Sequence, residues 1–488
     1  MDKIEFITLK DLIPILPEII VLITAFIVLI VDLFDSKRER SLTLALTTIV
    51  GLLLAAFYET HLYGKNISGF YGTIIADDFS ILFEFIYICV TIITVFVSLN
   101  YIKEHEINFG EYYVLLLTSV SGMMFLTSGV DLLVIFIGLE IMSISSYILV
   151  GMQRKIYISS EAALKYLLLG AFSTGFLLYG ISLIYGATGS TILPIIISEV
   201  QQNGTHNPLI ITGAALIVIA MSFKIALVPF HMWTPDVYTG APTPITGFLS
   251  GAAKAAGFAI FIRIFFNGIS LQGENWEQLF WTISVLTMTV GNIMALRQSE
   301  VKRMLAFSSI AHAGYVMIAV VVGNESAISS IIFYSLAYGL MGAGAFGVLS
   351  IKDAGRIPKT FEDMGGYGKR NPILALLMTL FIFSLIGLPL TGGFIGKFQI
   401  FSSALQEGWF WLTIFGILNS ALSVYYYLRV VMFMYMRDAA LPEGSKFAGS
   451  SIGFALTGLL GTAVAIIYLG IFPDKIMELA SSSIIALL

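Results

Sequence analysis

Long apolar stretches, separated by short polar breaks, run along the whole chain. A membrane-spanning helix needs about 20 mostly apolar residues, and about fourteen stretches of that kind can be marked. They cover residues 12–34, 42–58, 77–101, 111–129, 131–150, 160–186, 209–230, 244–267, 278–297, 303–322, 328–351, 371–401, 408–436 and 452–472. Strands of a membrane barrel would alternate over segments of about ten residues. The pattern therefore predicts an all-α polytopic membrane protein with about fourteen transmembrane helices.

Composition agrees with a chain that lies in lipid. Of 488 residues, 57% are hydrophobic and 12% charged, about half the charged share of roughly 25% in soluble domains. No small-residue cleavage signature follows the first apolar run, so we interpret it as a retained helix and not a signal peptide. The single cysteine, Cys89, excludes an internal disulfide and a multi-cysteine metal or iron–sulfur site, and we expect it to be buried as a small apolar side chain.

Basic residues divide unevenly between alternate loops. Most lie near residues 37–40, 103, 154–155, 297–303, 352–370 and 437–446, whereas the other side holds only Lys3, Lys10, Lys65 and Lys475. Lysine and arginine gather in cytoplasmic loops, so both termini should lie outside. One helix more or less anywhere would scramble this asymmetry, which therefore also favours fourteen spans.

Two of the predicted spans are interrupted. In the seventh, Pro229 precedes a polar run, and in the twelfth the segment 387–393 includes Pro389, Gly392 and Gly393. Broken helices at membrane depth persist only where they are buried in protein or line water, and paired breaks indicate a transport site. The two breaks lie five spans apart, and five is odd, so spans 4–8 and 9–13 should form two inverted five-helix units.

This count gives four regions. We expect helices 1–3 in residues 1–110, the first five-helix unit in 111–270 and the second in 271–437. Helix 14 and a short tail should occupy residues 438–488.

Five ionisable residues lie inside apolar stretches, where charge is costly and usually faces a protein interior or a wet cavity. They are Glu140, Lys165, Lys224, Lys254 and Lys397. We interpret them as a path for protons. Structural alternatives stay open, because Lys165 is near enough to its helix end to snorkel to the headgroups and the others could form buried ion pairs.

Several further polar residues each leave alternative roles open. His312 could relay protons, since its reference pKa is about 6.5, or could be a hydrogen-bonded core residue, and His231 could be a structural contact or part of a proton uptake path. Arg263 and Arg429 lie toward helix ends, where snorkelling is the favoured account. Glu84 should lie near an interface or pack against a partner.

Buried lysine suits a proton path because desolvation disfavours its charged form, whereas a nearby carboxylate favours it. If Glu140 pairs with Lys224, the lysine keeps its proton, and loss of that pair would let the lysine release it. The chain shows no Walker A motif, dinucleotide fingerprint or cysteine cluster. We therefore expect no cofactor in this chain, and a gradient or partner subunits as the energy source.

Three stretches, residues 159–180, 223–238 and 387–397, resemble the N-subunit family of bacterial NADH-quinone oxidoreductase, respiratory complex I. These are SSEAALKYLLLGAFSTGFLLYG, FKIALVPFHMWTPDVY and GLPLTGGFIGK. The resemblance implies an antiporter-like subunit in the bacterial inner membrane that translocates protons. It also implies other antiporter-like and small membrane subunits as partners, with NADH, FMN, iron–sulfur clusters and quinone bound by partner subunits. Nothing points to nucleic acid.

The resemblance also assigns the buried residues by motif. It implies that Glu140 is the glutamate of helix five, Lys224 the lysine of broken helix seven, and Lys254 the central lysine of helix eight. Lys397 corresponds to the lysine of broken helix twelve, and Lys165 to a further lysine of helix six. Only about sixteen residues follow Phe472, which argues against the related L subunit with its long lateral helix.

Other functions remain possible at this point. A subunit of a multisubunit sodium/proton antiporter would share the fold and the lysine–glutamate chemistry, although the stretch beginning at Ser159 speaks against it. An equivalent subunit of a ferredoxin-dependent complex would look similar. A membrane scaffold would use its buried charges only to hold helices in register.

Overall fold

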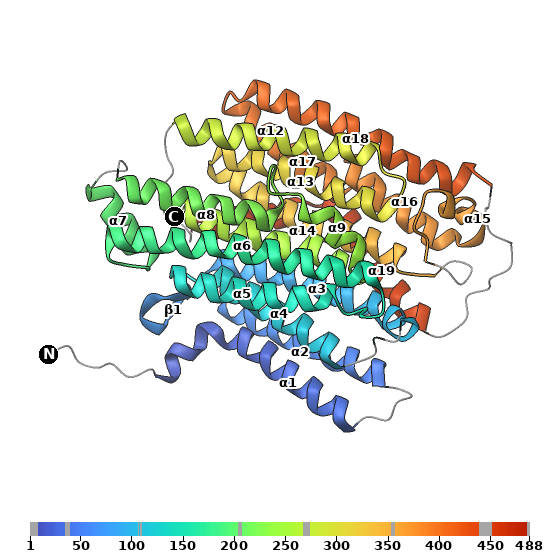
Figure 1. Cartoon of the computed structure of the whole chain (residues 1–488), viewed down its shortest axis with the longest axis horizontal. Helices are drawn as coiled ribbons and strands as arrows, with labels where there is room; N and C mark the ends of the chain where they lie inside the picture. The colour runs from blue at the N-terminus through green and yellow to red at the C-terminus, as the bar shows by residue number, and fades with distance from the viewer. Residues whose placement is uncertain are drawn as a thin grey trace.

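The structure, a computed structural model, describes residues 8–34, 40–105, 107, 110–203, 207–266, 274–352, 357–438 and 451–485. Nearly all of these residues lie in helices that run side by side along the long axis of the molecule (Figure 1). The helical membrane protein predicted from the apolar stretches is therefore confirmed.

The elements follow in a simple order. The first part holds η1 (Leu9–Ile15), α1 (Leu16–Phe34), α2 (Arg40–Leu62), β1 (Ile67–Gly69), η2 (Phe70–Gly72), β2 (Ile74–Ala76), α3 (Asp78–Glu104), α4 (Gly110–Ser128), α5 (Leu132–Val150), α6 (Tyr157–Thr188) and α7 (Leu193–Asn203). The middle holds α8 (Pro208–Ile225), α9 (Trp233–Gly240), α10 (Thr243–Phe248), η3 (Leu249–Ala253), α11 (Lys254–Phe265), α12 (Glu274–Leu296), α13 (Val301–Val322) and α14 (Glu325–Leu349). The last part holds η4 (Glu362–Met364), α15 (Tyr367–Arg370), α16 (Pro372–Ile386), α17 (Gly392–Gln406), α18 (Phe410–Met436), α19 (Ser451–Ile471) and α20 (Asp474–Ile485).

Twelve helices in the described part of the chain are long and apolar enough to cross a membrane. The number becomes thirteen if η4 to α16, which bend by 118° at Asn371, count as one span. The 19-residue α4 and the 15-residue helices α16 and α17 are not among the twelve. By this criterion the chain is an integral membrane protein, with fewer straight spans than the predicted fourteen.

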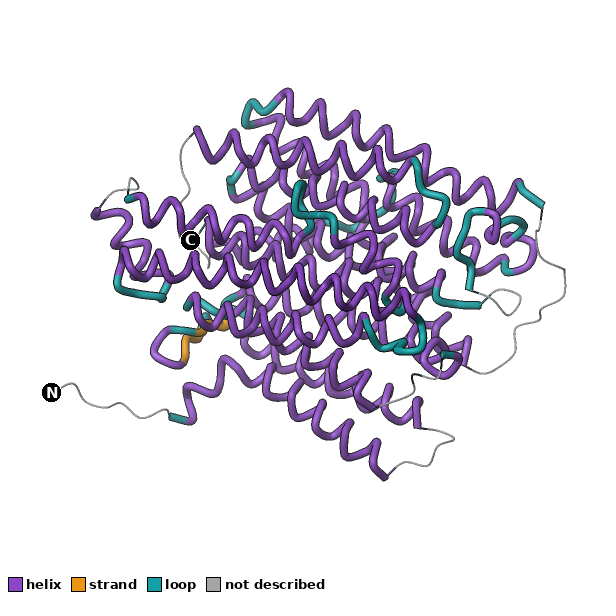
Figure 2. The backbone as a smooth tube through the Cα atoms, in the orientation of Figure 1, coloured by secondary structure: helices purple, strands orange, loops and turns teal. Residues whose placement is uncertain are grey.

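Three elements were not predicted. A two-stranded antiparallel sheet pairs Ile67 with Ala76, and Figure 2 draws it in orange at one end of the bundle. The sequence did not predict this small sheet, because segments of three residues are too short to show a periodic pattern. Helices α7 and α20 form in segments expected to be a polar break and a tail, where weak hydropathy hides an amphipathic helix.

The first predicted break separates α8 from α9, in the teal loop near the centre of Figure 2. Ala226 ends α8 in the left-handed conformation, with φ of 62°. The freed backbone groups find partners: the Trp233 indole donates to the Phe223 carbonyl at 2.8 Å, and the amide of Val228 donates to the Thr287 hydroxyl at 3.0 Å. Because these backbone groups have partners, the helix can be interrupted at a position that water does not reach.

The second predicted break separates α16 from α17 and depends on glycine. Gly387 has a φ of 92°, which a residue with a Cβ rarely adopts. A Cβ on Gly393 would lie 2.0 Å from the Ser384 carbonyl oxygen, and one on Gly392 would lie 3.0 Å from Leu469. Pro389 is exposed within the same turn. Both interruptions are thus confirmed at the positions that the sequence marks.

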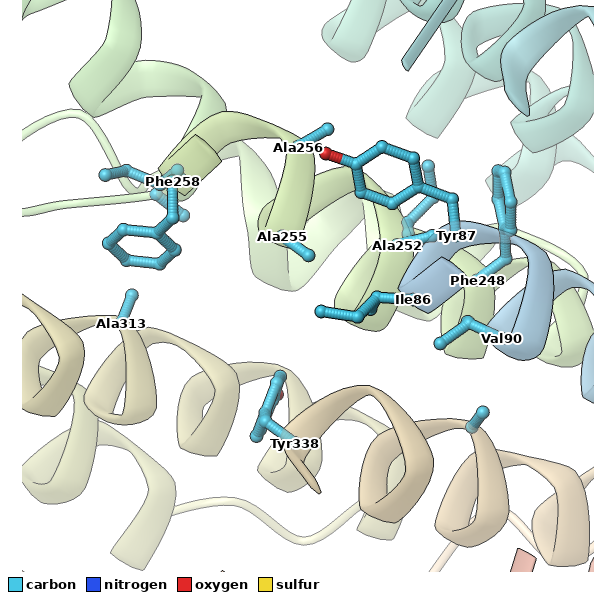
Figure 3. Close-up of a cluster of buried hydrophobic side chains, with 14 of the residues drawn as sticks. Ile86, Tyr87, Val90, Phe248, Ala252, Ala255, Ala256, Phe258, Ala313 and Tyr338 are labelled. Atoms are coloured by element: carbon cyan, nitrogen blue, oxygen red, sulfur yellow. The ribbon is translucent and has the colours of Figure 1, made fainter. Parts of the chain in front are cut away.

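The centre of the bundle is packed through small residues. Figure 3 shows Ala252, Ala255 and Ala256 between the side chains of α3, α13 and α14. Gly251 approaches α14 so closely that a Cβ would lie 3.0 Å from the Gly339 Cα atom. The segment η3, which directly precedes Lys254, is π-helical. Single π-helical turns inside α-helices often mark functional positions.

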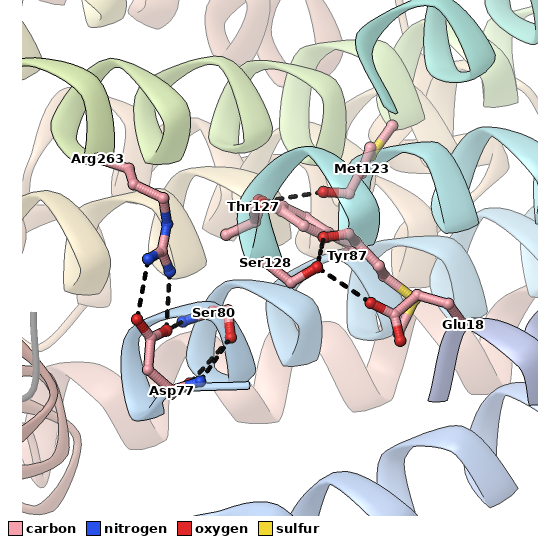
Figure 4. A network of polar contacts seen from close by, with 9 residues as sticks. Glu18, Asp77, Ser80, Tyr87, Met123, Thr127, Ser128 and Arg263 are labelled. Atoms are coloured by element: carbon pink, nitrogen blue, oxygen red, sulfur yellow. Dashed lines mark hydrogen bonds and ion pairs between the residues drawn. The ribbon is translucent and has the colours of Figure 1, made fainter. Parts of the chain in front are cut away.

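Arg263 corrects one expectation from the sequence. Its side chain is 1% exposed, and its guanidinium donates to both carboxylate oxygens of Asp77 at 2.9 and 2.8 Å (Figure 4). The prediction that Arg263 snorkels was wrong, because the carboxylate that neutralises it lies 186 residues earlier in the sequence. Arg429 is half-buried, with its guanidinium 4.0 Å from the centre of the Phe361 ring. Cys89, expected to be buried, is exposed on α3.

Removing one partner of the Arg263–Asp77 pair should be more harmful than removing both. Arg263→Met leaves Asp77 buried without its cation, and breaking a buried pair in this way costs about 3–5 kcal/mol. We expect less of the subunit in membranes and a lower thermal inactivation temperature of the assembled complex. The double variant Asp77→Asn/Arg263→Met should recover most of the loss. Equal damage in the single and double variants would contradict an ion-pair role.

Candidate functional site

Three of the predicted lysines and His312 are buried in the protein interior. Lys224 lies in α8, Lys254 begins α11, His312 lies in α13 and Lys397 lies in α17. Their exposed fractions are 6, 4, 2 and 4%. Together with Glu140 on α5, we call these residues the central row.

Glu140 and Lys224 lie close to each other without forming the predicted pair. The Lys224 amine donates to the Ser143 hydroxyl at 2.8 Å and to the Tyr147 hydroxyl at 3.4 Å. Glu140 is half-buried and accepts a hydrogen bond from the Thr174 hydroxyl at 2.8 Å. Since Ser143 and Tyr147 follow Glu140 by three and seven residues, they lie on the same face of α5. Lys224 is thus bound about one helical turn from Glu140.

Lys254 follows the π-helical turn and contacts α13. Its amine donates to the Ser309 carbonyl at 2.7 Å and to the Ser309 hydroxyl at 2.9 Å. The same amine lies 6.0 Å from the centre of the Tyr238 ring. No carboxylate takes part in these contacts.

A small cavity joins Lys254 to His312. Both residues line it, together with Ser309, Tyr334 and Tyr338 among others. The space open to the centre of a water molecule is about 20 Å³, and about 10–15 Å³ by that measure holds one water. The cavity is therefore large enough for water to bridge polar groups of α11 and α13.

His312 is held on both ring nitrogens by tyrosines. Nδ1 bonds to the Tyr334 hydroxyl, and Nε2 lies 2.9 Å from the Tyr427 hydroxyl, which in turn contacts the Ser308 hydroxyl. Histidine and tyrosine hydroxyls can each donate and accept. This network extends the polar connection from α13 to α14 and α18.

Lys397 lies at the second helix break. Its amine donates to the Leu385 carbonyl at 2.9 Å, the Ile386 carbonyl at 3.0 Å and the Ser420 hydroxyl at 3.2 Å. These carbonyls end α16, so the amine binds at the negative end of the helix dipole. The Tyr315 ring lies 5.0 Å from the amine and 5.5 Å from the His312 ring, between the two.

Lys165 belongs to a different environment. It is 43% exposed and forms ion pairs with Glu161 and Asp236, each at 2.8 Å. Asp236 also binds Arg303 at 2.9 Å. The structure thus places Lys165 in a half-exposed network of opposite charges and gives it no hydrogen bond to the central row.

His231 is also apart from the central row. It is half-buried in the loop between α8 and α9, and its Nδ1 atom has no hydrogen-bond partner. Pro229 lies in the same loop and is exposed, lining an apolar pocket with Phe230 and Trp233.

The hydroxyl residues of the site were not identified from the sequence. Ser143 carried a usable signal, because it shares a helix face with Glu140. Ser309, Ser420, Tyr334 and Tyr427 carried none, since serine and tyrosine occur throughout the apolar stretches. Only the packing of distant helices brings them to the amines and to His312.

Comparison with known proteins places this geometry in a family. Residues 129–423 match the family described as NADH:quinone oxidoreductase/Mrp antiporter, TM. The NADH-quinone oxidoreductase subunit N of Trichlorobacter lovleyi is 44% identical over 472 residues, 96% of each chain. Subunit N 1 of Herpetosiphon aurantiacus is 42% identical over 471 residues, 95% of each chain.

Solved structures agree. A chain of respiratory complex I from Thermus thermophilus superposes with a TM-score of 0.79 at 31% identity, covering 95% of this chain and 99% of that one. A chain of the Mrp complex from Dietzia gives a TM-score of 0.81 at 20% identity, covering 98% and 97%, and so shows the shared fold alone. The chain therefore belongs to the NADH:quinone oxidoreductase/Mrp antiporter family of membrane proteins, as its three characteristic sequence stretches predict.

Proposed function

We propose that this chain translocates protons along the central row as the N-type membrane subunit of an NADH:quinone oxidoreductase. The observation that carries the proposal is how the three buried amines are bound. Lys224, Lys254 and Lys397 contact only hydroxyl and carbonyl oxygens. Among the described residues, no carboxylate lies within 4.0 Å of any of the three.

This binding suits a group that must both take and give up a proton. A buried ion pair fixes the charge of its lysine or arginine, because removing that charge leaves the carboxylate unpaired. Neutral oxygen atoms favour the ammonium more weakly, while burial disfavours it. The three amines thus lack the carboxylate partner that holds the charge of Arg263 in place. Lys165, with two carboxylate partners, fits the role of a fixed charge better than that of a proton carrier.

The contacts also supply parts of a continuous route. From Lys254 the polar connection runs through Ser309 and the cavity to His312. Between Lys224 and Lys254 the rings of Tyr147, Tyr166, Trp233 and Tyr238 pack in succession, with centroids 4.6 to 6.0 Å apart, so water would have to link the tyrosine hydroxyls there. Hydroxyl groups and water can pass a proton on because each donates and accepts.

Glu140 would act as the switch. Ser143 binds Lys224 about 4.5 Å along the α5 axis from Glu140, a distance that side-chain rotation can bridge. When Glu140 pairs with Lys224, the ammonium is favoured, and when Glu140 binds Thr174 instead, as seen here, the proton is freer to leave. Partner membrane subunits would bias this choice, driven by electron transfer from NADH through FMN and iron–sulfur clusters to quinone in other subunits.

The proposed architecture keeps fourteen spans. Added to the twelve straight spans, α4 and the broken pair α16–α17 make fourteen. An even number of spans places both ends of the chain on the same side of the membrane. The contacts agree with this: Tyr63, directly after α2, lies 3.3 Å from Ser482 in α20 near the C-terminus. Near the N-terminus, η1 packs on β1, which also follows α2. We propose two inverted units, α4 to α11 and α12 to α18, each with its broken helix in the fourth place, and both termini on the outer side of the bacterial inner membrane.

An antiporter subunit remains the second candidate, because the matched family includes Mrp antiporters. The relatives that cover nearly the whole chain at 39–44% identity are N subunits of NADH-quinone oxidoreductase, and this favours the redox-driven complex.

Proton uptake by inverted vesicles on addition of NADH, with no requirement for sodium, is the expected result. Sodium-dependent exchange without NADH would favour the antiporter.

Lys254→Ala should uncouple electron transfer from proton pumping. Removing the amine that binds Ser309 should slow NADH-driven pumping by on the order of a hundredfold or more, as for loss of an acid–base group. Pumping is measured with a pH-sensitive dye in inverted vesicles, and assembly by NADH oxidation with a hydrophilic acceptor. Lys352→Ala, which removes a surface partner of Glu104, is the matched control and should pump normally. Normal pumping by an assembled Lys254→Ala complex would refute the proposal.

Ser143→Ala tests the neutral partner of Lys224. Loss of one hydrogen bond to a charged group is worth about 1.5–3 kcal/mol, so the rate of pumping should fall by roughly tenfold to a hundredfold while assembly is kept. Ser145→Ala, on another face of α5, serves as control and should have little effect. Equal pumping by the Ser143 and Ser145 variants would show that the hydroxyl of Ser143 plays no part.

A further inference from the structure

A second group of buried acids lies outside the central row. Glu18 is near the start of α1, Glu59 is in the last turn of α2 and Glu84 is within the first two turns of α3. Their exposed fractions are 0, 1 and 3%. All three therefore lie at the end of the bundle that carries β1 and β2, on three helices that contact one another or α4.

The carboxyl groups of Glu59 and Glu84 come within reach of each other where α2 packs on α3. Two carboxylates offer only acceptors, so a hydrogen bond between them requires a proton on one of them. Glu18 accepts a hydrogen bond from the Ser128 hydroxyl at 3.2 Å through one oxygen, as Figure 4 shows. Its other oxygen, Oε2, and the Oε1 atom of Glu59 are buried without any hydrogen-bond partner.

In the part of the chain that the structure describes, no cation is paired with these acids. Arg263 is the buried cation of this region, and both of its terminal nitrogens are already bound to Asp77. None of the ion pairs among the described residues includes Glu18, Glu59 or Glu84. Lys475 and Glu478 of α20, which packs on α3, are exposed. An unpaired carboxylate in an apolar interior is costly, so the group needs another source of neutralisation.

A metal ion does not fit this geometry. Within the part of the chain that the structure describes, no three His, Cys, Asp or Glu side chains converge on one position as metal ligands would. A proton needs only one carboxyl oxygen and a hydrogen-bond acceptor, which the Glu59–Glu84 contact supplies.

We propose that Glu18, Glu59 and Glu84 form a second proton-holding site, separate from the central row, in which Glu59 and Glu84 share a proton. The unpartnered oxygens of Glu18 and Glu59 are the positions where a further proton binds. The site does not depend on the proposed path through the lysines, because none of its contacts involves Glu140, Lys224, Lys254 or Lys397.

Infrared spectroscopy of the purified complex tests the proposal directly. A protonated carboxylic acid has a carbonyl stretch distinct from carboxylate bands, and that band shifts in heavy water. At neutral pH the unmodified complex should show such a band, and Glu59→Gln or Glu84→Gln should remove it. Glu111→Gln changes an exposed acid on α4 and should leave the band intact. This readout does not require the complex to pump.

A double variant protects the test against misfolding. In Glu59→Gln/Glu84→Gln the two amides can still form a neutral hydrogen bond, so the complex should assemble even if a single variant does not, and the band should be absent. A carboxylic acid band that is unchanged in the double variant, or missing from the unmodified complex at neutral pH, would overturn the proposal.

Discussion

The cost of placing a charge in an apolar interior shapes this protein more than any other interaction. Each buried ionisable group must be paired, neutralised by a proton or bound by neutral dipoles. The chain uses the first and the last of these solutions in different places. Arg263 is paired with Asp77, whereas Lys224, Lys254 and Lys397 are bound by hydroxyls and carbonyls. The first arrangement fixes a charge, and the second, in the function proposed above, leaves it free to change.

The helix breaks follow from the same constraint applied to the backbone. An interrupted helix in a membrane exposes carbonyl and amide groups that need partners. At the α16–α17 break the freed carbonyls of Leu385 and Ile386 bind the Lys397 amine, so backbone and lysine satisfy each other. At the α8–α9 break the Trp233 indole donates a hydrogen bond to the carbonyl of Phe223, the residue before Lys224. Each break therefore creates a polar position beside a lysine without admitting an opposite charge.

Burial, in turn, depends on close helix packing. The alanines of α11 and the approach of Gly251 to Gly339 bring α3, α11, α13 and α14 together. Packing of small residues is a common means of helix association in membranes, where the apolar solvent gives little drive for association. Here it also sets the size of the cavity between Lys254 and His312, which admits water but little else.

The sequence by itself determined the membrane character of the chain, its family, both helix breaks and the positions of Glu140, Lys224, Lys254 and Lys397. Hydropathy, glycine and proline placement and charges in apolar runs are local signals that survive in one dimension. Tertiary structure alone decided which charged side chains form ion pairs and which do not. The sequence could not show that Arg263 meets Asp77, that Lys165 meets Asp236, or that Lys224 binds Ser143 and not Glu140. Those outcomes depend on contacts between helices far apart in the chain. The hydropathy of a span does not specify which helix it will pack against.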